Sequence, residues 1–329
     1  MFTKYLSRAL TTRADQLDAE YQGAMRLFNG FYEGCPELVA DLYGKTLVLF
    51  DYTRSPEGNP NQLAVAQNLI LERLPWIETT VQKGRFASDP DKRRGIVSYG
   101  DILSTQIREH GIWYALNLIM HQDASFYIDT RHLRQWLLEN AASWQVLNTF
   151  AYTGSLGLAA LAGGARHVVQ MDRNPKFLVL ARQGGMINHL DIGKMKQRTG
   201  DFFNEVANFK RSGTLFDCVI VDPPFFSTTK KGTVDLVYES TRVINKVRPL
   251  IQDVGWLVAI NNALFLSGSE YIRSLEELCA DGYLAIDRLI PVPTDITGYP
   301  ETIVDAPPTD PAPFNHSTKI VLLKVRRKA

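Results

Sequence analysis

Asp172 has the residue type and the position of a side chain that binds a ribose. It ends an apolar run, and that run follows a small-residue turn closing at Gly154 and a helix-like stretch of leucines and alanines. Strand, glycine turn, helix and strand form one βαβ unit, which places backbone N–H groups and a helix N-terminus above the first strand. A carboxylate at the tip of the second strand can accept two hydrogen bonds from ribose hydroxyls. Residues 145–172 therefore predict a nucleoside site.

The turn of this unit reads AYTGSLG (151–157) and differs from a dinucleotide fingerprint. The pattern GxGxxG needs a first glycine so that the turn tightens beside a pyrophosphate, and that glycine is absent here. A larger residue at this place suits a ligand without a diphosphate, which disfavours a nicotinamide oxidoreductase. A plain crossover that binds nothing is the other interpretation that this unit alone leaves open.

A second cluster, Asp222-Pro223-Pro224-Phe225, follows the apolar run 216–221. Two prolines fix φ and remove N–H donors, so the chain stops pairing and leaves the sheet at a set angle. Carbonyl and carboxylate acceptors are then available to hold the exocyclic amine of a base, and the phenylalanine ring can stack on its face. An ordinary strand-terminating turn is the alternative, and the position two βα units after the nucleoside site favours the functional interpretation.

Between these clusters, Gly200-Asp201-Phe202 follows a further expected strand near residues 195–199. An adenine ring would lie there if the preceding acid holds its ribose, because Asp201 can accept from the adenine amine and Phe202 can cover the ring. An aspartate after a strand is usually a helix N-cap, which is the alternative. The order of glycine turn, acid, Asp-Phe and DPPF is more specific than any one member.

In this order the motifs resemble those of class I S-adenosylmethionine-dependent methyltransferases. More closely, the chain resembles the bacterial 23S rRNA large-subunit methyltransferases I and K. The resemblance rests on REHGIWYALNL (108–118), SFYIDTRHLR (125–134), VLNTFAYTGSLGLAALAGGA (146–165), DPPFF (222–226) and, for methyltransferase I, RLFNGFYEGCPELVADLYGKTLVL (26–49). It covers nearly the whole chain from about residue 25 and does not include the N-terminal PUA-type RNA-binding module of methyltransferase I.

The resemblance assigns expected roles to individual residues. Asp129 and Arg131 would frame the methionine moiety. The alternative for Arg131 and Arg134 is a helix-start ion pair with Asp129. The expected cofactor-binding set is Asp129, Arg131, Asn148, Phe150, Tyr152, Thr153, Gly154, Asp172, Arg173, Asp201, Phe202 and Asp222. The expected catalytic set, which would border the methyl group and the acceptor, is Asp222, Pro223, Pro224, Phe225 and Asn261.

One departure from methyltransferase I bears on the chemistry. Cytosine-C5 methylation needs a covalent thiolate, which methyltransferase I carries at the end of the strand after DPP. Here that position reads VAINN (258–262), while Cys218 falls mid-strand, Cys279 on a late helix and Cys35 in the small domain. The Asn-Asn pair looks more like the guanine-modifying half of methyltransferase K, and a ring nitrogen or amine needs only in-line placement against a sulfonium methyl. The sequence therefore favours nitrogen methylation, with an unrecognised C5 nucleophile as the alternative.

Alternating strands and helices must position these residues. Seven strands in the second part of the chain predict a doubly wound, Rossmann-like α/β sheet that binds ligands at the carboxyl ends of its strands. Helices are expected at 1–28, 61–74, 129–137, 156–162, 174–188, 203–211, 234–251 and 269–281, and strands at 36–42, 46–52, 112–119, 125–128, 146–149, 168–172, 195–199, 216–221, 256–260, 283–290 and 319–325. A small α/β domain with a possible RNA or substrate contact is expected at 1–105, and the methyltransferase domain at 106–329.

The composition is that of an ordinary globular protein of 329 residues, 45% hydrophobic and 22% charged, with a net charge of +1. This balance gives no global field to attract a polyanion, so nucleic acid must be bound by local patches. The candidates are Lys83, Arg85, Lys92, Arg93, Arg94, Lys230, Lys231, Lys324, Arg326, Arg327 and Lys328. Each could equally be part of a solvated surface, except the pair Lys230-Lys231, which directly follows the DPPFF stretch beside the expected cleft. The cysteines are too widely spaced for zinc, and the histidines show no metal spacing.

The apolar runs are too short for a spanning helix, and the N-terminal segment lacks the apolar core of a secretion signal. A cytoplasmic protein is expected, and a surface helix is preferred over an organelle transit peptide for the first residues. The main hypothesis is a metal-independent S-adenosylmethionine-dependent methyltransferase acting on ribosomal RNA. The alternatives are a binding relative without turnover, a methyltransferase with a protein or small-molecule amine acceptor, and an oxidoreductase.

Overall fold

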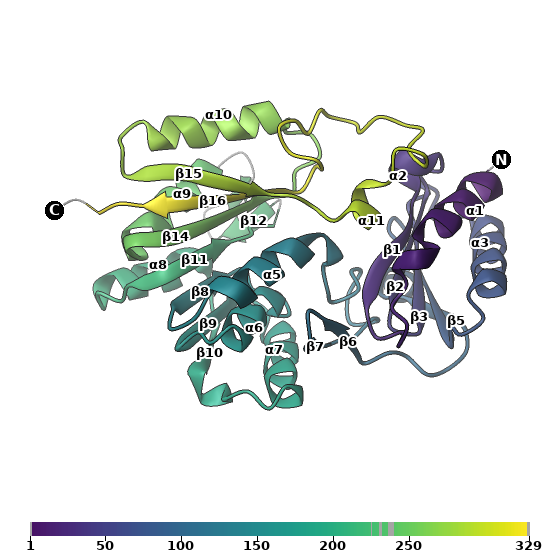
Figure 1. Ribbon diagram of the computed structural model, residues 1–329, viewed down its shortest axis with the longest axis horizontal. Helices are drawn as coiled ribbons and strands as arrows, with labels where there is room; N and C mark the ends of the chain where they lie inside the picture. The colour runs from purple at the N-terminus through teal and green to yellow at the C-terminus, as the bar shows by residue number, and fades with distance from the viewer. Residues whose placement is uncertain (1, 225, 230–231, 236–239, 328–329) are drawn as a thin grey trace. The chain divides into compact units, whose positions relative to one another are not determined.

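The computed structural model describes residues 2–224, 226–229, 232–235 and 240–327, which fold into two compact units (Figure 1). Unit 1 comprises residues 1–131 and 293–307, and unit 2 comprises residues 132–292 and 308–329. Phe225, Lys230, Lys231 and Lys328, all named above as candidate contacts, lie outside the described residues. No helix among the described residues is long and apolar enough to cross a membrane.

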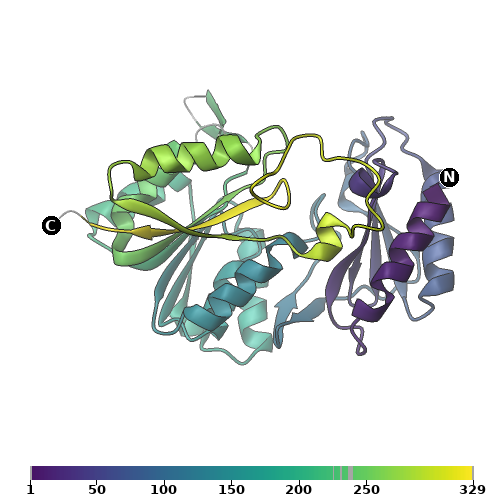
Figure 2. The same cartoon turned by 45° about the horizontal axis from the view of Figure 1, so that its top comes forward.

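Unit 1 is built on a five-stranded sheet in the order β1-β2-β3-β4-β5, in which only β3 and β4 run parallel. Its elements are α1 (Phe2–Arg13), η1 (Ala14–Gln16), β1 (Ala24–Asn29), α2 (Gly30–Glu33), β2 (Leu38–Tyr43), β3 (Thr46–Asp51), α3 (Pro60–Arg73), β4 (Thr79–Gly84), α4 (Pro90–Arg94), β5 (Ile96–Tyr99), β6 (Gln106–Glu109), β7 (Ile112–Ala115), η2 (Ile128–Thr130) and α11 (Thr294–Thr297). Helices α1 and α3 lie on one face of the sheet (Figures 1 and 2). Leu6, Ala66 and Ile70 from these helices pack with Leu38 and Leu47 of the sheet in one buried core.

Unit 2 is a seven-stranded sheet in the order β10-β9-β8-β11-β14-β16-β15, in which β16 pairs antiparallel with β14 and β15 and all other neighbouring strands are parallel. Its elements are α5 (Arg131–Asn140), β8 (Gln145–Thr149), α6 (Ser155–Ala162), β9 (His167–Asp172), α7 (Pro175–Ile187), η3 (Ile192–Lys194), β10 (Met195–Thr199), α8 (Phe202–Arg211), β11 (Phe216–Val221), β12 (Phe226–Thr229), β13 (Gly232–Asp235), α9 (Ser240–Val247), η4 (Arg248–Leu250), β14 (Ile251–Asn261), α10 (Gly268–Cys279), β15 (Leu284–Ile290) and β16 (Lys319–Val325). The predicted doubly wound sheet is thus confirmed.

Both faces of this sheet are covered by helices, as a parallel sheet requires. On one face, Val243 and Ile244 of α9 and Leu275 of α10 pack with Val219 of β11 and Leu257 of β14. Helix α9 contacts both α8 and α10 on that face, and α6 contacts α7 in a separate layer. The central strands β8, β9, β11 and β14 are mostly buried, whereas the edge strands β10 and β15 are largely exposed.

Several expected elements differ from the structure. The helix expected at 1–28 ends at Arg13, and residues 24–29 form β1 instead. Met25 and Leu27 are buried at alternating positions, which is the period of a strand, and β2 pairs with them in antiparallel register. The stretch 125–128 is not a strand, and the helix expected from 234 begins at Ser240, after a strand at 232–235.

The division into units also differs from the expected boundary after residue 105. Unit 1 continues to Arg131 and takes up residues 293–307 from far along the chain. Asp295 of α11 explains why residues 293–307 belong to unit 1. Its carboxylate accepts from the backbone N–H of Arg26 at 2.9 Å and binds the Arg131 guanidinium at 2.8 and 3.2 Å. Asn29 donates to the carbonyl of the next residue, Ile296, at 2.8 Å. These buried polar contacts tie α11 to strand β1.

Candidate functional site in unit 2

The expected site residues of unit 2 fall on five successive connections at one edge of the sheet. Strands β10, β9, β8, β11 and β14 are adjacent and parallel, so their carboxyl ends lie side by side. The glycine turn follows β8, Asp172 ends β9, Asp201 follows β10, Asp222 follows β11 and Asn261 ends β14. Ligands of open α/β sheets bind at this edge. The topology therefore brings together residues spread over more than a hundred positions of sequence.

The turn after β8 is wound by three left-handed residues. Phe150, Tyr152 and Gly154 have φ of 53°, 49° and 79°. Bulky residues rarely adopt this conformation, and it clusters at binding and catalytic sites. A Cβ on Gly154 would also lie 2.4 Å from the Cβ of Ala181, so close packing of α7 requires glycine there. The Tyr152 ring packs edge-on against Phe177 of the same helix.

Asp172 is held rigidly at the tip of β9. One carboxylate oxygen accepts from the backbone N–H of Tyr152 and the other from that of Asn174, both at 2.8 Å. Burial raises the pKa of Asp172, and these backbone hydrogen bonds and nearby Arg173 act in the opposite direction. Since each carboxylate oxygen has a second lone pair, the group can still accept from a ligand's hydroxyls. Arg173 itself is exposed at the surface next to it.

Gln170 was missed in the sequence and supports the turn from within the sheet. It is fully buried on β9, accepts from Asn148 Nδ2 at 2.8 Å and donates from Nε2 to the carbonyl of Gly154 at 2.9 Å. Asn148 is only 1% exposed, and this contact lets it support the turn; its expected direct contact with the cofactor stays a prediction. A polar residue in the otherwise apolar run 168–171 was the available signal.

The connection after β10 has a structural role in addition to its expected role in ligand binding. Asp201 is the N-cap of α8, accepting from the backbone N–H groups of Phe203 and Asn204 at 3.0 and 3.3 Å. Phe202 is 5% exposed and stacks on Phe150 with ring centroids 4.7 Å apart. The Phe150 ring is more exposed than that of Phe202, so of this pair Phe150 has the more accessible surface for a planar ligand.

The DPP turn follows β11 directly. Asp222 is partly buried, Pro223 buried and Pro224 exposed. Tyr271 of α10, which is 1% exposed, was not singled out in the sequence, yet burial and the charge of Asp222 both raise the pKa of its phenol. A neutral phenol near the carboxylate is therefore part of the surroundings of Asp222.

The Asn-Asn pair carries two polar atoms that no described residue satisfies. Asn261 is 2% exposed; its Oδ1 accepts from the N–H of Ala263 at 3.1 Å, and its Nδ2 has no partner among the described residues. Within the same part of the chain, Oδ1 of Asn262 is also unsatisfied. Unpaired buried polar groups are costly and call for an explanation, which a ligand at this edge would supply. Lys319, opposite Asn261 on β16, donates to the carbonyl of Ala263 at 2.9 Å and fixes the chain after β14.

None of the three cysteines belongs to the strand-end connections that form this edge. Cys218 lies in the middle of β11, is fully buried, and its thiol pKa is raised well above its ordinary value by burial. Cys279 ends α10 and Cys35 is buried in unit 1, where burial raises its pKa to about 11. A thiolate nucleophile needs a lowered pKa and access to substrate, and none of the three cysteines combines them.

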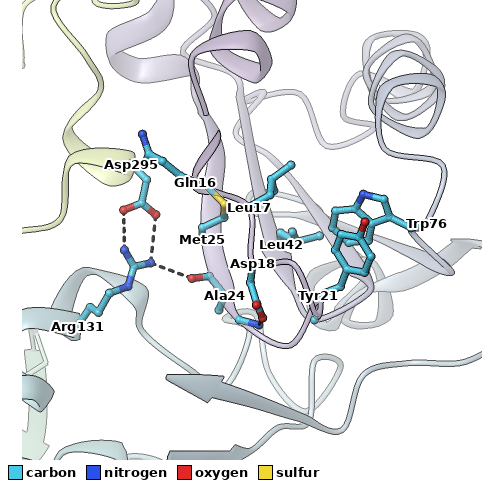
Figure 3. Close-up of a pocket in the computed structure, with 12 residues that line it drawn as sticks. Gln16, Leu17, Asp18, Tyr21, Ala24, Met25, Leu42, Trp76, Arg131 and Asp295 are labelled. Atoms are coloured by element: carbon cyan, nitrogen blue, oxygen red, sulfur yellow. Dashed lines mark hydrogen bonds and ion pairs between the residues drawn. The ribbon is translucent and has the colours of Figure 1, made fainter. Parts of the chain in front are cut away.

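Asp129 and Arg131 belong to unit 1 by their contacts. Arg131 binds Asp295, contacts Glu109 at 3.3 Å and donates to the carbonyl of Ala24 at 2.8 Å. The alternative expected for Arg131 was an ion pair with Asp129, whereas the partners that the structure gives it are Asp295 and Glu109. Figure 3 shows this pair on one side of a cavity of about 110 Å³ in unit 1, with Tyr21 stacked on Trp76 at the other side. A role of Asp129 and Arg131 toward the methionine moiety stays a prediction.

The basic loop of unit 1 contributes less charge to the surface than expected. Lys83 is fully buried and donates to the carbonyls of Arg94 and His121, and burial lowers its pKa to about 7. Arg85 pairs with Asp123 at 2.7 Å. A phosphate contact by Lys83 is therefore wrong, because its ammonium group cannot be reached. No cluster of three or more metal-binding side chains occurs in the described part of the chain.

A left-handed turn, three acids and an unsatisfied Asn-Asn pair along the carboxyl edge of parallel strands define an α/β protein of the class that binds a nucleoside cofactor. The chain belongs to the family of S-adenosylmethionine-dependent methyltransferases, whose model matches residues 61–289. The fixed carboxylate of Asp172 and the turn after β8 fit the ribose and adenosine part of that cofactor.

Two bacterial proteins are similar to this chain over most of its length. The chain is 28% identical to YwbD of Bacillus subtilis (strain 168) over 266 residues, covering 80% of this chain and 66% of that protein. It is 35% identical to ribosomal RNA large subunit methyltransferase I of Aliivibrio fischeri (strain MJ11) over 231 residues, covering 70% and 58%. The chain thus spans 58% to 66% of the length of these two relatives.

Solved structures agree in fold. The structure of SMU.776 complexed with SAH matches with a TM-score of 0.83 and 22% identity, covering 98% of this chain and 81% of that chain. A tRNA m1G37 methyltransferase of M. jannaschii matches with a TM-score of 0.56 and 12% identity, covering 99% and 79%. At these identities the likeness is one of fold.

Proposed function

We propose that this chain transfers a methyl group from S-adenosylmethionine to a nitrogen of a nucleobase in large-subunit ribosomal RNA. The observation that carries the nitrogen assignment is the Asn261–Asn262 pair at the end of β14, where a C5 enzyme of this kind would need a thiol. Relatives named as ribosomal RNA large subunit methyltransferases support the RNA class. Bound S-adenosylmethionine supplies an electrophilic methyl group on a sulfonium.

In this proposal the residues of the chain hold the cofactor and the base and orient them toward each other. Asp172 accepts from the ribose hydroxyls and holds the cofactor over the turn after β8, which Gln170 keeps in its left-handed shape. Asp222 and the carbonyls of the DPP turn accept from the amine or N–H of the base. Such placement converts a bimolecular reaction into an effectively unimolecular one, which lowers the activation free energy by up to ~7–11 kcal/mol in well-oriented systems.

The buried Nδ2 of Asn261 adds a hydrogen-bond donor, which would meet an acceptor on the base edge. A carboxylate on one side and an amide donor on the other suit a base that carries both an N–H and a carbonyl or ring nitrogen. A nitrogen nucleophile already has its lone pair, so no covalent intermediate with the protein is needed. Phe225, the expected stacking residue, completes the proposed set.

The test compares modified nucleosides in ribosomal RNA from the parent and a deletion strain by mass spectrometry. Loss of one N-methylated nucleoside, restored by the intact gene and not by an Asp222→Ala gene, is the expected result. Loss of 5-methylcytidine instead would overturn the nitrogen assignment. Unchanged RNA, together with label from tritiated cofactor appearing in protein or in a small molecule, would overturn the RNA assignment.

A further inference from the structure

The connection after β14 presents two exposed apolar side chains just beyond the Asn-Asn pair. Leu264 and Phe265, which we call the apolar tip, are 53% and 48% exposed. The residues on either side of them are directed inward, since Ala263 is buried and Leu266 packs against the core of unit 2. Large apolar groups that are exposed side by side at the rim of a site often mark a binding surface.

Both ends of this connection are fixed by hydrogen bonds. The N–H of Ala263 donates to Oδ1 of Asn261 at 3.1 Å, and its carbonyl accepts from the buried ammonium group of Lys319 at 2.9 Å. On the other side, Ser267 begins α10 with a capping box that includes Glu270. Only three residues separate Ala263 from Ser267. The apolar tip is therefore held in place by the sheet and by α10.

The apolar tip lies close to the proposed acceptor site. Phe265 follows Asn261 by four positions, and a chain of that length spans at most about 14 Å even when it is fully extended. Nδ2 of Asn261 and Oδ1 of Asn262, which no described residue satisfies, belong to the same short stretch. A ligand that meets these amide groups would therefore bring its neighbouring parts to the tip.

The composition of this connection suits contact with bases and not with phosphates. From Val254 to Ser269 the sequence contains no charged residue, so no basic side chain of this stretch is available to a phosphate. Phenylalanine and leucine are among the side chains that proteins insert between the base steps of nucleic acids. A base that is modified on its ring edge has to leave its stack, which costs free energy. A rigid apolar group that fills the vacated position offsets this cost.

We propose that Phe265, flanked by Leu264, is a positioning residue that enters the base stack of the RNA and takes the place of the extruded acceptor base. This inference rests on the proposed RNA methyltransferase function and adds to it the means by which the acceptor base is kept out of its stack. The Phe265 ring stacks on the base next to the vacated position, while Asp222 and Asn261 hold the edge of the extruded base. Phe265 takes no part in the methyl transfer itself.

Single-turnover methyl transfer tests the proposal, with tritiated S-adenosylmethionine as donor and ribosomal RNA from a strain that lacks the gene as acceptor. Phe265→Ala is expected to lower the maximal rate roughly tenfold, within the range found when base-stacking aromatic residues are replaced by alanine. The contact is used to hold the base out of its stack, so the RNA concentration at half-saturation should change less than about threefold. Phe265→Tyr keeps a flat ring and should retain most of the rate.

Two controls separate this role from a general structural one. Val254→Ala removes an apolar side chain that is 65% exposed near the other end of β14, and it should leave the rate unchanged. Isothermal titration with S-adenosylhomocysteine should give the same dissociation constant for the wild type and for Phe265→Ala, because the tip does not contact the cofactor in this proposal.

An unchanged maximal rate in Phe265→Ala, or a loss that Phe265→Tyr shares in full, would overturn the proposal. A loss confined to the RNA concentration at half-saturation would make the tip a surface that only anchors RNA, and weaker binding of S-adenosylhomocysteine would assign Phe265 to the support of the cofactor site. A wild type that labels no RNA contradicts the proposed function and this inference together. A wild type that labels RNA no faster than Phe265→Ala contradicts this inference alone.

Discussion

Gln170 Nε2 donates to the carbonyl oxygen of Gly154 at 2.9 Å, across the space between strand β9 and the turn that follows β8. The same side chain accepts from Asn148, so one buried amide joins two strands and the turn. It lies so close to the next helical turn that a Cβ on Gly157 would be 2.5 Å from its amide atoms. The left-handed turn is thus held in place by a buried side chain of the neighbouring strand.

We expect Gln170→Met to weaken cofactor binding without unfolding the chain. The substitution preserves volume but leaves the Gly154 carbonyl and Asn148 amide without their partner, which costs about 1–3 kcal/mol per buried group. Isothermal titration with S-adenosylhomocysteine measures the loss. Gln197→Met is the control, since its Nε2 also donates to a backbone carbonyl, that of Leu178, away from the turn. Equal affinities of the two variants would contradict the positioning role.

Asp172→Ala should raise the dissociation constant of the cofactor by about 10–100-fold, corresponding to about 1.4–2.8 kcal/mol. The variant removes the ribose acceptor and also frees the N–H groups of Tyr152 and Asn174. Asp191→Ala, which removes a comparable loop contact to the N–H of Gly193, serves as control. An unchanged dissociation constant for Asp172→Ala would remove this residue from the site.

Substitutions of Asp222 and Cys218 are expected to affect methyl transfer differently. Asp222→Ala should reduce methyl transfer by at least about a hundredfold, the scale of losing one polar group that acts in the transition state. Cys218→Ala should keep transfer near the wild-type rate, because the thiol is buried in mid-strand. Single-turnover transfer to total ribosomal RNA gives both rates. A folded Cys218→Ala protein without activity would reopen the thiolate mechanism.

Asp295→Asn should destabilise unit 1 by about 3–5 kcal/mol, the usual cost of breaking a buried ion pair on one side. Asp295 is 3% exposed and binds both the Arg131 guanidinium and the N–H of Arg26. Hydrogen exchange at the Arg26 amide reports the loss directly. Asp305→Asn, an exposed neighbour in the same segment, should leave the exchange rate unchanged. Equal protection in both variants would show that α11 is not anchored by this carboxylate.

Lys319 predicts a dependence of stability on alkaline pH. Burial lowers its pKa to about 8, from an ordinary value of 10.5. Between these values the folded chain binds fewer protons than the unfolded chain, so this group makes the free energy of unfolding rise with pH. Below about pH 8 the buried ammonium group is charged in the folded chain, and its full destabilising effect is present. Urea unfolding of the wild type and of Lys319→Met at several pH values isolates the group. From pH 8 to 10.5 the free energy of unfolding of the wild type should rise relative to that of Lys319→Met. A difference between the two free energies that does not change with pH would refute the assignment.

The sequence predicted those parts of the fold whose periodicity is strong and local. The hairpin of β2 and β3 follows from the Tyr43-Gly44-Lys45 turn, where Gly44 takes φ of 58°, and the βαβ unit around Gly154 follows from its apolar runs. The order of the ligand-edge residues was readable because each ends or follows an expected strand, although the strand before Asp201, Met195–Thr199, is polar and mostly exposed. The expected assignment of their roles remains a prediction for the bound state.

Other features could not be read from local pattern. Gln170 looks like an interruption in an apolar strand until its partners on β8 are known. The attachment of α11 to β1 joins residues nearly 270 positions apart, and a single helical turn in a proline-rich loop has no periodicity to detect. The apolar spacing of Leu17, Tyr21 and Met25 fits a helix locally, and pairing with β2 decides for a strand in residues 24–29.

The passage of residues 293–307 through unit 1 has a practical consequence for anyone who divides this chain. A fragment that stops at Arg131 loses the carboxylate on which that arginine and strand β1 depend. A fragment that starts at His132 keeps the sheet of unit 2 but carries α11 as an exposed segment without its buried partners. Neither unit is encoded by one uninterrupted stretch of the gene, so the two must be expressed and inherited together.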